Sequence, residues 1–354
     1  MSGSSLTEVA KASGVSLATA SRVLNPNNAH PVSDDVRARV LAAAEALSYS
    51  VNALARGLKV QRTRVVAAIV HDFRDPFFNT VAKGVTDAAE AAGYLTVLCN
   101  SSRDPEKELR YVGLAQQQRV AGVLFVGGGL ASRGYRDAMR RQVETLWAYG
   151  AHAIALEPRG SRMPAEIPDN RGGARQATDH LVTLGHRRIA FIDGPAQVLT
   201  SRERLRGYRD GLEAAGIAFD ERLVARGDFT EEGARTALAG LLDGDVPFTA
   251  VFASNDAMAI GCLVELRARG VAIPRDMSLV GFDDIAPVRW FDPPLTTVRV
   301  PMEEIGAAGV ARLLALLEAD DRGATLNGRL VNIHPTELVV RATTAPPAGG
   351  ERRP

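Results

Sequence analysis

The spacing of hydrophobic positions divides this chain into a short first part and a long second part. In the first part, apolar residues recur at helical spacing, which predicts three short helices over residues 6–12, 16–25 and 34–47. From residue 64 onward, continuous apolar runs alternate with amphipathic stretches. This alternation is typical of strands buried on both faces and of the helices that cover them. The pattern therefore predicts an all-α head followed by an α/β core.

The second part contains two successive α/β units of similar size. The first unit has predicted strands at 65–70, 95–98, 122–126 and 153–156, and helices at 80–92, 105–118 and 133–146. The second has predicted strands at 189–192, 223–225, 250–252 and 278–280, and helices at 172–184, 201–215, 231–242 and 256–269. A helix over 303–317 and a strand over 336–340 follow. We therefore expect two lobes, each built on a doubly wound parallel sheet, with a ligand-binding cleft between them.

Local signals in the head predict a helix-turn-helix. Ser5 and Glu8 fit an S-x-x-E capping box before the first helix. Ser16 can cap the second helix and Ser33 the third, while Gly14 begins the tight turn between the first two. A second helix held in this way can enter the major groove of DNA. An ordinary helical hairpin is the alternative that these signals leave open.

Packing of the head would separate a buried set of side chains from an outward set. The apolar residues that can share one small core are Val9, Ala10, Val15 and Val23. The residues left on the outer side of the second helix are Leu17, Ala18, Ser21 and Arg22. Residues 1–62 also carry seven basic side chains against four acidic ones, whereas the remainder carries 35 basic and 37 acidic. A basic head on a slightly acidic body favours a nucleic-acid contact at one end.

The composition of the chain indicates the cellular compartment in which the protein acts. Of the 354 residues, 46% are hydrophobic and 23% are charged, which is ordinary for a soluble globular protein. No apolar run approaches the roughly 20 residues of a membrane span, and the N-terminus lacks the pattern of a secretory signal. Cys99 and Cys262 sit in apolar stretches, which favours buried free thiols. We expect a cytoplasmic protein with no membrane partner and a disordered tail over 344–354.

Motifs for catalysis and for cofactor binding are absent from the sequence. It contains no G-x-S-x-G, H-E-x-x-H or P-loop, and its six histidines show no metal-ligand spacing. The glycines at 127–129 follow a predicted strand but lack the G-x-G-x-x-G order of a nucleotide-binding loop. We therefore expect no enzyme activity, no cofactor and no metal.

Two groups of motifs carry a family resemblance. In the head these are Leu6-Thr7-Glu8-Val9-Ala10, Gly14-Val15-Ser16 and Ser21-Arg22-Val23-Leu24-Asn25. In the core they include Asp75-Pro76-Phe77-Phe78, Leu184-Gly185-His186, Ser254-Asn255-Asp256, Gly281-Phe282-Asp283-Asp284 and Pro294-Leu295-Thr296-Thr297. In this order they resemble the lactose/galactose repressor (LacI/GalR) family of bacterial transcription regulators, over residues 5–343. The resemblance implies a homodimer that binds a palindromic double-stranded DNA operator, and a core of the periplasmic-binding-protein type.

The resemblance also implies domain boundaries. Residues 1–50 would form the helix-turn-helix domain, 51–62 the hinge helix and linker, 63–343 the effector-binding core, and 344–354 the tail. The chain would cross between the lobes near 168–170, 298–300 and 325–331. The N-terminal lobe would then take 63–168 and 301–325, and the C-terminal lobe 169–298 and 329–343.

Arg22 is the candidate for reading bases on the DNA side, because its guanidinium can donate to both O6 and N7 of guanine; a phosphate contact is the alternative. Leu17 and Ala18 occupy variable specificity positions of the family, where they can only touch thymine methyl groups or fill space. Leu58 matches the leucine that the family inserts into the minor groove, with packing against the core as the alternative. The remaining candidate DNA contacts are Leu6, Ser16, Thr19, Ser21, Asn25, Asn52 and Ala55.

The effector site implied by the resemblance has polar and aromatic members. The polar members are Asp75, Arg204, Asn255 and Asp283, and Glu157 lies near a further acidic contact of the family. Guanidinium, amide and carboxylate groups suit the hydroxyls of a sugar. The aromatic members, Phe77, Phe78 and Phe229, could cover a sugar face or a base ring, with core packing as the alternative.

Together these observations predict a transcription regulator, a repressor controlled by a small effector in the interlobe cleft. The residues of the effector site are compatible with a sugar, a nucleoside or a phosphorylated metabolite as effector. They leave open whether the effector releases the protein from DNA or strengthens its binding to DNA. The alternative from another class is a solute-binding protein, or a sugar-acting enzyme with the same two-lobed fold. The absent secretory signal and the absent catalytic motifs argue against both.

Overall fold

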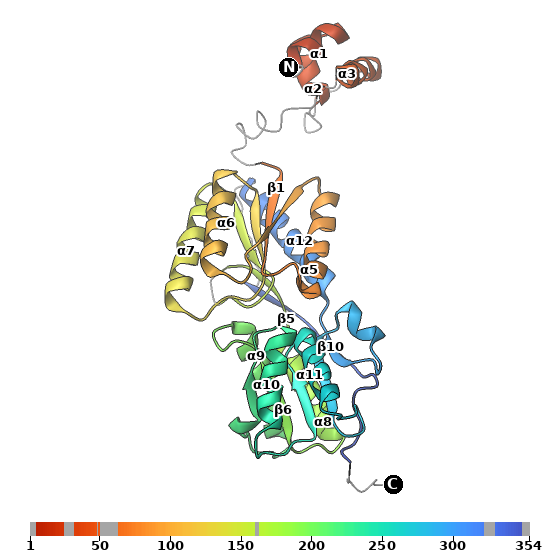
Figure 1. Cartoon of the computed structure of the whole chain (residues 1–354). Helices are drawn as coiled ribbons and strands as arrows, with labels where there is room; N and C mark the ends of the chain where they lie inside the picture. Colours follow the sequence, from red (N-terminus) through yellow and green to blue (C-terminus); the bar gives the residue numbers. More distant parts are fainter. Residues whose placement is uncertain are drawn as a thin grey trace. The chain divides into compact units, whose positions relative to one another are not determined.

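The computed structural model describes residues 5–24, 32–47, 49, 63–159, 163–321 and 330–348. The chain forms two compact units, the head (Met1–Thr63) and the core (Arg64–Pro354). The described part of the head is helical, and the described part of the core contains two six-stranded sheets with helices on both faces (Figure 1). These observations confirm the predicted fold class, an all-α head with a two-lobed α/β core.

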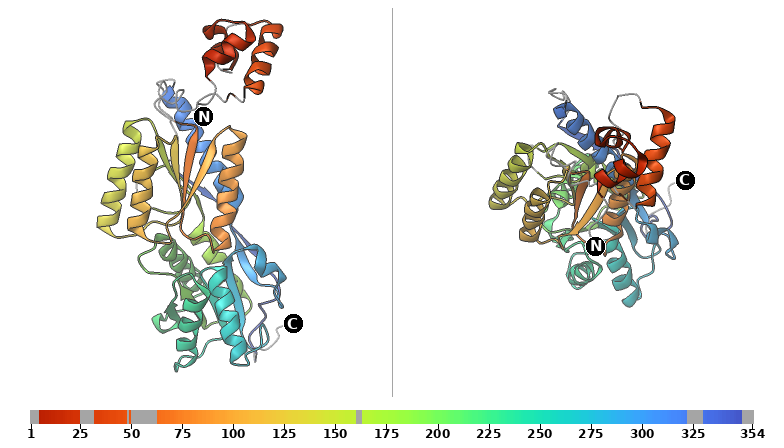
Figure 2. Two further views of the ribbon diagram at one scale, coloured as in Figure 1. Left: turned by 45° about the horizontal axis from the view of Figure 1, so that its top comes forward. Right: turned by 90° about the horizontal axis from the view of Figure 1, so that it is seen from above.

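Three short helices pack together in the head: α1 (Leu6–Ser13), α2 (Leu17–Leu24) and α3 (Asp34–Ala46) (Figure 2). The buried side chains between them are small and aliphatic: Val9, Ala10, Ala20, Val23, Val40 and Ala44. Val15 packs against this cluster while remaining half-buried. Because the buried side chains are small, each helix of the head contacts both of the others.

Capping interactions set the path of the chain through α1 and α2. Ser5 Oγ accepts from the backbone N–H of Glu8 at 3.3 Å, and Ser5 N donates to Glu8 Oε2 at 2.6 Å, which completes the predicted capping box. Gly14 then takes a φ of +66°, a left-handed conformation that ends α1. Ser16 Oγ accepts from the backbone N–H three residues on, at 3.1 Å, and so caps α2. Ser33 precedes α3 as expected, but its side chain makes no capping hydrogen bond.

The first lobe of the core is built on a parallel sheet with the strand order β11-β5-β4-β3-β1-β2. Its strands are β1 (Val65–Val70), β2 (Leu95–Asn100), β3 (Gly122–Val126), β4 (His152–Ala155), β5 (Ala165–Pro168) and β11 (Val331–His334). Its helices are α5 (Pro76–Ala91), α6 (Pro105–Gln117), α7 (Arg133–Ala148) and α12 (Met302–Asp321). Helices α5 and α12 pack together on one face of the sheet, and α6 and α7 pack together on the other (Figure 1).

The second lobe repeats this plan with the strand order β12-β10-β9-β8-β6-β7. Its strands are β6 (Ile189–Asp193), β7 (Val224–Arg226), β8 (Ala250–Ala253), β9 (Ser278–Asp283), β10 (Thr296–Arg299) and β12 (Glu337–Val339), of which only β12 runs antiparallel to its neighbour. Its helices are α8 (Asn170–Thr183), α9 (Leu199–Ala214), α10 (Glu231–Leu242) and α11 (Asp256–Ala268), with short 3-10 turns η1 (Glu221–Leu223) and η2 (Ala286–Trp290). Within the described ranges, no helix is both long enough and apolar enough to span a membrane.

Helix α5 begins at Pro76, four residues before the predicted start at residue 80. Asp75 causes the early start, because its side chain accepts from the backbone N–H of Phe77 at 3.0 Å while Pro76 supplies a fixed φ at the first helical position. The hydrophobic periodicity does not show this turn, since Phe77 and Phe78 are adjacent rather than three or four residues apart. The early start places the rings of Phe77 and Phe78 in the first turn of α5, at the end of the helix that follows β1.

The chain passes between the two sheets at 169, at 300–301 and at 335–336. The third passage corrects the expected one at 325–331, because β11 pairs with β5 in the first lobe instead of belonging to the second. Strand β11 is only half-buried, so its hydrophobic pattern is weak. A buried carboxylate holds it in place: Glu166 on β5 accepts from Asn332 at 2.8 Å and lies 2.9 Å from the imidazole of His334.

Candidate functional site

The outward face of α2 is the candidate DNA-binding surface of the head. Leu17 is 50% exposed, Ala18 and Arg22 are also exposed, and Ser21 is half-buried beside them. Ala20 and Val23, on the opposite side of the same helix, are buried in the head. Arg22 is exposed, and its side chain makes no hydrogen bond or ion pair with any residue that the structure describes.

The other candidate DNA contacts lie near this face or outside the described residues. Ser16 is exposed, whereas Leu6 and Thr19 are half-buried. Ser16 Oγ lies 2.8 Å from the Thr19 hydroxyl, so both polar groups already take part in capping α2. Asn25, Asn52, Ala55 and Leu58, together with the predicted hinge over 51–62, fall outside the described residues.

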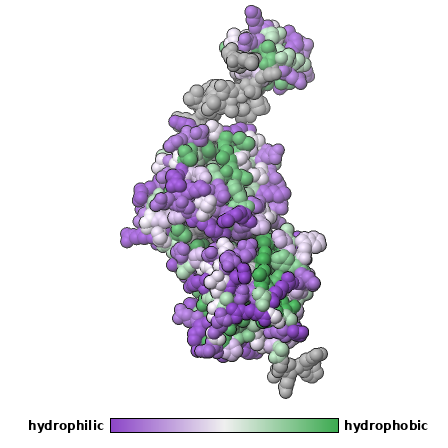
Figure 3. All heavy atoms as spheres, in the orientation of Figure 1, coloured by the Kyte–Doolittle hydropathy of each residue, from purple (hydrophilic) through white to green (hydrophobic). Residues whose placement is uncertain are grey.

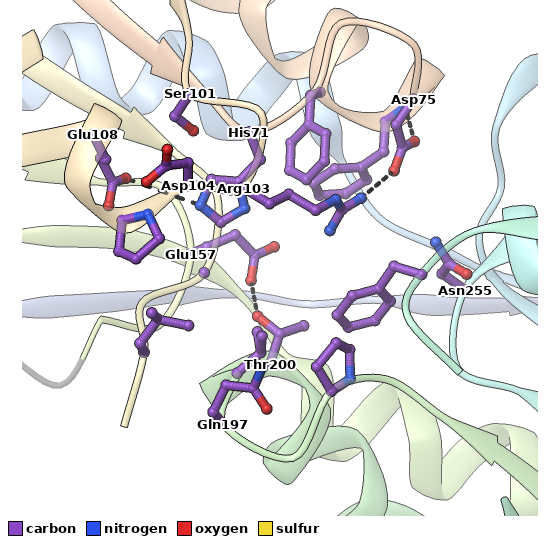
Figure 4. Close-up of a pocket in the computed structure, with 18 of the residues that line it drawn as sticks. His71, Asp75, Ser101, Arg103, Asp104, Glu108, Glu157, Gln197, Thr200 and Asn255 are labelled. Carbon is purple, nitrogen blue, oxygen red and sulfur yellow. Dashed lines mark hydrogen bonds and ion pairs between the residues drawn. The ribbon is translucent and has the colours of Figure 1, made fainter. Parts of the chain in front are cut away.

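A cavity lies between the carboxyl ends of the strands of the two lobes (Figure 4). Its volume is about 130 Å³, roughly ten times the space of about 10 Å³ that one ordered water needs. Its wall is formed by residues that follow strands in both sheets: His71 after β1, Arg103 after β2, Glu157 after β4, Phe229 after β7 and Asn255 after β8. In an open α/β sheet this is the edge at which ligands bind.

The structure brings all seven effector-site candidates to the wall of this one cavity: Asp75, Phe77, Phe78, Arg204, Phe229, Asn255 and Asp283. Phe77 and Phe78 pack edge to face, with ring centroids 5.2 Å apart. Asn255 caps α11 through Oδ1, which accepts from the backbone N–H of Met258 at 2.9 Å. Its amide NH2 group therefore keeps its donors for a ligand.

Arg204 is the centre of the polar wall contributed by the second lobe. Its side chain donates to Asp283 Oδ1 at 2.9 Å and to Asn170 Oδ1 at 2.8 Å, and its Cζ lies 3.8 Å from the ring centroid of Phe282. The guanidinium also donates to the backbone carbonyl of Ser254. Burial raises the pKa of the Asp283 carboxyl, and the charge of Arg204 opposes that rise. The Arg204–Asp283 pair is thus buried and fixed by these hydrogen bonds. Ligand hydroxyls can bind only to those of its donor and acceptor atoms that face the cavity.

Glu157 links the wall of the first lobe to the second lobe. Its Oε2 accepts from the hydroxyl of Thr200, on α9, at 2.8 Å, whereas its Oε1 is buried and has no hydrogen-bond partner among the described residues. Burial raises the pKa of this carboxyl. Figure 4 shows the side chain pointing into the cavity. A ligand hydroxyl donating to Oε1 would satisfy the unpaired atom.

A buried polar cluster that sequence reasoning missed contributes His71, Glu108 and Tyr135 to the wall of the cavity on the side of the first lobe. Arg159 pairs with Glu108 and donates to the Tyr135 hydroxyl at 2.6 Å, and that hydroxyl donates to Glu108. His71 Nε2 lies 3.9 Å from Glu108 Oε1. Burial lowers the pKa of His71, and the charges of Arg159 and Arg103 lower it further, so the imidazole is neutral at pH 7. These groups are far apart in sequence and no motif connects them.

Two backbone hydrogen bonds also join the two lobes beside the cavity. Ala131 N donates to the carbonyl of Gln197 at 2.8 Å, and Leu199 N donates to the carbonyl of Gly129 at 3.1 Å. The two segments form an antiparallel bridge centred on Leu130 and Val198. Backbone bonds of this kind are independent of side-chain identity, so hydrophobic patterning could not predict them. Among the described residues, no group of His, Cys, Asp and Glu side chains is placed to hold a metal ion.

Comparisons with known proteins agree with this geometry. Residues 5–52 match the bacterial regulatory proteins of the lacI family, and residues 178–344 match the periplasmic binding protein-like domain. The HTH-type transcriptional regulator DegA of Bacillus subtilis (strain 168) is 33% identical over 342 residues, which cover 96% of this chain and 97% of DegA.

Two solved structures extend the likeness to the three-dimensional fold. The complex of the transcriptional regulator CelR with cellobiose matches with a TM-score of 0.70 at 33% identity, covering 96% of this chain and 99% of that one. The Lac repressor dimer bound to operator and the anti-inducer ONPF matches with a TM-score of 0.84 at 26% identity, covering 97% and 100%.

A helix-turn-helix head joined to a two-lobed core with a cavity at the carboxyl ends of its strands defines a ligand-controlled, DNA-binding transcription regulator. The chain belongs to the lacI family of bacterial regulatory proteins. It is therefore a regulator and not an enzyme, which excludes the alternative of a sugar-acting catalyst on the same fold.

Proposed function

We propose that this protein is a repressor that binds a palindromic operator as a homodimer and is controlled by a sugar-type effector in the interlobe cavity. The observation that carries the proposal is the cavity itself, in which charged, amide and aromatic side chains from both lobes surround one space. A ligand held by both lobes binds with different strength when their relative placement changes, and this difference is what allows a ligand to control a distant site.

The effector chemistry rests on three polar groups and three rings. The Arg204–Asp283 pair, the free amide of Asn255 and the unpaired Oε1 of Glu157 offer both donors and acceptors, which hydroxyls can meet because each hydroxyl both donates and accepts. The aromatic part of the wall is Phe77, Phe78 and Phe229. A sugar ring has an apolar face that such rings can cover. The match to the CelR–cellobiose complex supports this ligand class.

The DNA side rests on the exposed face of α2. Arg22 supplies the guanidinium that can read guanine, while Leu17 and Ala18 beside it present only apolar surface. We propose that sequence readout by this helix depends mainly on Arg22. Base selection by a single arginine is limited to about 1–3 kcal/mol, so specificity requires two heads acting on two half-sites.

The exposed edge of the first lobe is the proposed dimer contact. Strand β2 lies at the edge of its sheet, and three of its apolar side chains are exposed: Leu95 by 66%, Val97 by 44% and Leu98 by 42%. Leu114 on α6 is 50% exposed as well. Figure 3 shows apolar residues gathered on this lobe in the same orientation as Figure 1. An unpaired apolar edge favours association with a second copy, and the Lac repressor match is a dimer on its operator.

We further propose that the protein acts in the cytoplasm, where its operator DNA lies, and that the head, the hinge and the start of the core have the expected boundaries. In this division, residues 1–50 bind DNA and 51–62 connect the head to the core. The core begins near residue 63, which is supported by the start of β1 at Val65. The expected disordered tail over 344–354 begins too early, because the second lobe still holds residues 344 and 345: Ala345 N donates to Ser278 Oγ at 3.0 Å, and Thr344 Oγ1 lies 3.0 Å from His180 Nε2.

An operator-binding assay tests the proposal. Purified full-length protein is titrated against labelled palindromic duplexes by fluorescence anisotropy at one fixed salt concentration, with and without a panel of mono- and disaccharides. We expect one palindrome to bind at least a thousandfold more tightly than random DNA, and one sugar to change that affinity. Binding that no duplex sequence or sugar alters would contradict the proposal.

A further inference from the structure

Three arginine side chains lie at or beside the cavity, and two of them are closely paired with buried carboxylates. Arg204 is 2.9 Å from Asp283, and Arg159 contacts Glu108 and a buried hydroxyl. Arg103 differs from both. The one hydrogen bond of its side chain to a described residue runs from Nη2 to a carboxylate oxygen of Asp75, the N-cap residue of α5, at 3.4 Å. This distance is long for a charge-assisted bond, which is typically about 2.8 Å.

The guanidinium of Arg103 is oriented by rings from both lobes. Its Cζ lies 5.4 Å from the ring centroid of Phe78 in the first lobe and 5.5 Å from that of Phe229 in the second. Its Nε is buried without a hydrogen-bond partner. The side chain as a whole is 29% exposed and extends across the cavity toward Asp75 (Figure 4). Most of the donors on this cation are therefore unused and lie at the ligand cavity.

The loop that carries Arg103 is held in a conformation that L residues rarely adopt. Ser102 has a φ of +54° and Arg103 a φ of +59°. The backbone N–H of Arg103 donates to the carbonyl of His71 at 3.0 Å, and the N–H of Ser102 donates to Asn100 Oδ1 at 3.1 Å. Strained backbone that is fixed by several hydrogen bonds is characteristic of ligand-binding loops.

We infer that Arg103 determines the class of effector: a sugar that carries an oxyanion, either a carboxylate or a phosphate, bound by this guanidinium. The inference rests on the proposed role of the cavity as the effector site. A planar guanidinium binds two oxygens of a carboxylate or phosphate side by side, a geometry that a single hydroxyl cannot match. The hydroxyls of the same ligand would bind at Glu157 and Asn255.

The carboxylates near Arg103 leave most hydrogen-bond donors of its guanidinium available to such a ligand. Asp72 is bound twice by Arg74, at 3.1 and 2.8 Å. Asp228 is exposed, so water screens its charge. Asp75 gives one carboxylate oxygen to the first turn of α5 and makes only the long contact to Arg103 with the other. None of the three saturates the guanidinium.

Matched ligand pairs test the inference on the full-length protein. Calorimetry and thermal shift would compare glucose with glucuronate and glucose 6-phosphate, galactose with galacturonate, and ribose with ribose 5-phosphate. The variants are Arg103→Gln, which removes the charge, and Arg103→Lys, which keeps it without the planar fork. Arg110→Gln is the control, because Arg110 is an exposed arginine on α6 outside the cavity wall.

We expect one acidic sugar to bind wild-type protein at least about tenfold more tightly than its neutral parent, as a charged hydrogen bond requires. Arg103→Gln should abolish that ratio, because it should weaken binding of the acid far more than binding of the neutral parent. Arg103→Lys should lose most of the ratio, and Arg110→Gln should keep it. The carboxylate and phosphate arms identify which oxyanion is bound. Neutral sugars that bind as well as their acids, or a ratio that survives in Arg103→Gln, would overturn the inference and leave the proposed function intact. Failure of every sugar and sugar acid to bind would remove both.

Discussion

Thr200 donates its hydroxyl hydrogen to Glu157 Oε2 at 2.8 Å, and this hydrogen bond joins the two lobes at the wall of the cavity together with a longer one, of 3.5 Å, from Asn170 Nδ2 to the same oxygen. Glu157 follows β4 in the first lobe, and Thr200 lies in the first turn of α9 in the second. Both residues are buried, and the second oxygen of Glu157 has no partner among the described residues. A ligand that binds this carboxylate is therefore in direct contact with the junction between the lobes.

Replacing Thr200 with valine should destabilise the core by about 1–3 kcal/mol, because it leaves the buried Glu157 carboxylate with only the long 3.5 Å hydrogen bond from Asn170 Nδ2. Urea denaturation of the full chain would measure the change. Thr183→Val is the control, since the exposed Thr183 hydroxyl donates only to a backbone carbonyl within α8 and its loss should cost less than about 0.5 kcal/mol. Equal effects of the two substitutions would argue against a special role for the junction.

Arg204→Ala should abolish effector binding and lower the stability of the core by about 3–5 kcal/mol, because it leaves Asp283 buried without its cation. Calorimetry and denaturation would report the two effects separately. A double-mutant cycle with Asp283→Asn should give a coupling energy of about 1–3 kcal/mol. Normal ligand affinity in Arg204→Ala would show that this side chain is not part of the effector site.

Arg22→Ala should lower the preference for operator over random DNA by about 1–3 kcal/mol at fixed salt, because a bidentate contact to guanine is lost. Arg39→Ala is the charge-matched control in the same head, since Arg39 pairs with Asp35 on α3 at 3.3 Å. Its loss should weaken binding to both DNAs alike. The competition ratio in an anisotropy assay decides the point, and an unchanged ratio in Arg22→Ala would refute base reading by this residue.

Val97→Lys should convert the dimer to a monomer and weaken operator binding, because it places a charge on the apolar edge strand β2. Sedimentation velocity would give the oligomeric state. The matched control is Ile333→Lys, which changes an exposed apolar residue on the opposite edge strand, β11. The control should remain a dimer. Since Val97 is 44% exposed, the melting temperature of the core should change little, and a Val97→Lys protein that remains dimeric would place the contact elsewhere.

Asp256 predicts a pH dependence of stability in the second lobe. Burial raises the pKa of this carboxyl to about 7. A carboxyl with a raised folded-state pKa binds more protons in the folded than in the unfolded state between about pH 4 and 7, so its contribution is lost as pH rises through that window. Asp256→Asn cannot ionise. Its amide oxygen can still accept from the backbone N–H of Ile285, and its amide NH2 group can donate to the Thr297 hydroxyl, which donates to the carboxylate in the wild type.

The stability of Asp256→Asn relative to wild type should therefore increase from pH 4 to pH 7, by up to about 1.4 kcal/mol per pH unit. Urea denaturation at intervals across this range would measure it. A constant difference between the two proteins would mean that the Asp256 carboxylate remains ionised throughout, held by its two donors.

Short-range signals in the sequence were sufficient for most elements of the fold. The capping box of Ser5 and Glu8 and the fully buried runs of β1 and β3 depend on a few consecutive residues, and each element formed where it was expected. The strands that were not predicted, β5, β10 and β11, are short. Strand β11 is held partly by polar contacts to Glu166, which alternation of apolar residues cannot reveal.

The site shows the same division. Asn255 and Asp283 belong to sequence motifs, and the family resemblance implies a role for Arg204; the fold places all three on one cavity wall. Arg103 and Tyr135 carry no motif, and their roles depend on partners that are distant in the chain, such as Phe229 and Glu108. A guanidinium that is only partly paired cannot be recognised until every neighbouring acceptor is known.

The sequence by itself determined the class of fold, the family and the outward face of α2, because helix spacing, caps and buried runs are local properties of the chain. Only the tertiary structure decided which lobe contains residues 331–334, how Glu157 meets Thr200, and that Arg103 keeps unused donors. These features depend on the distances between segments that are remote in sequence. Hydrogen bonds and desolvation act over a few ångströms, so their outcome is known only once those segments have been brought together.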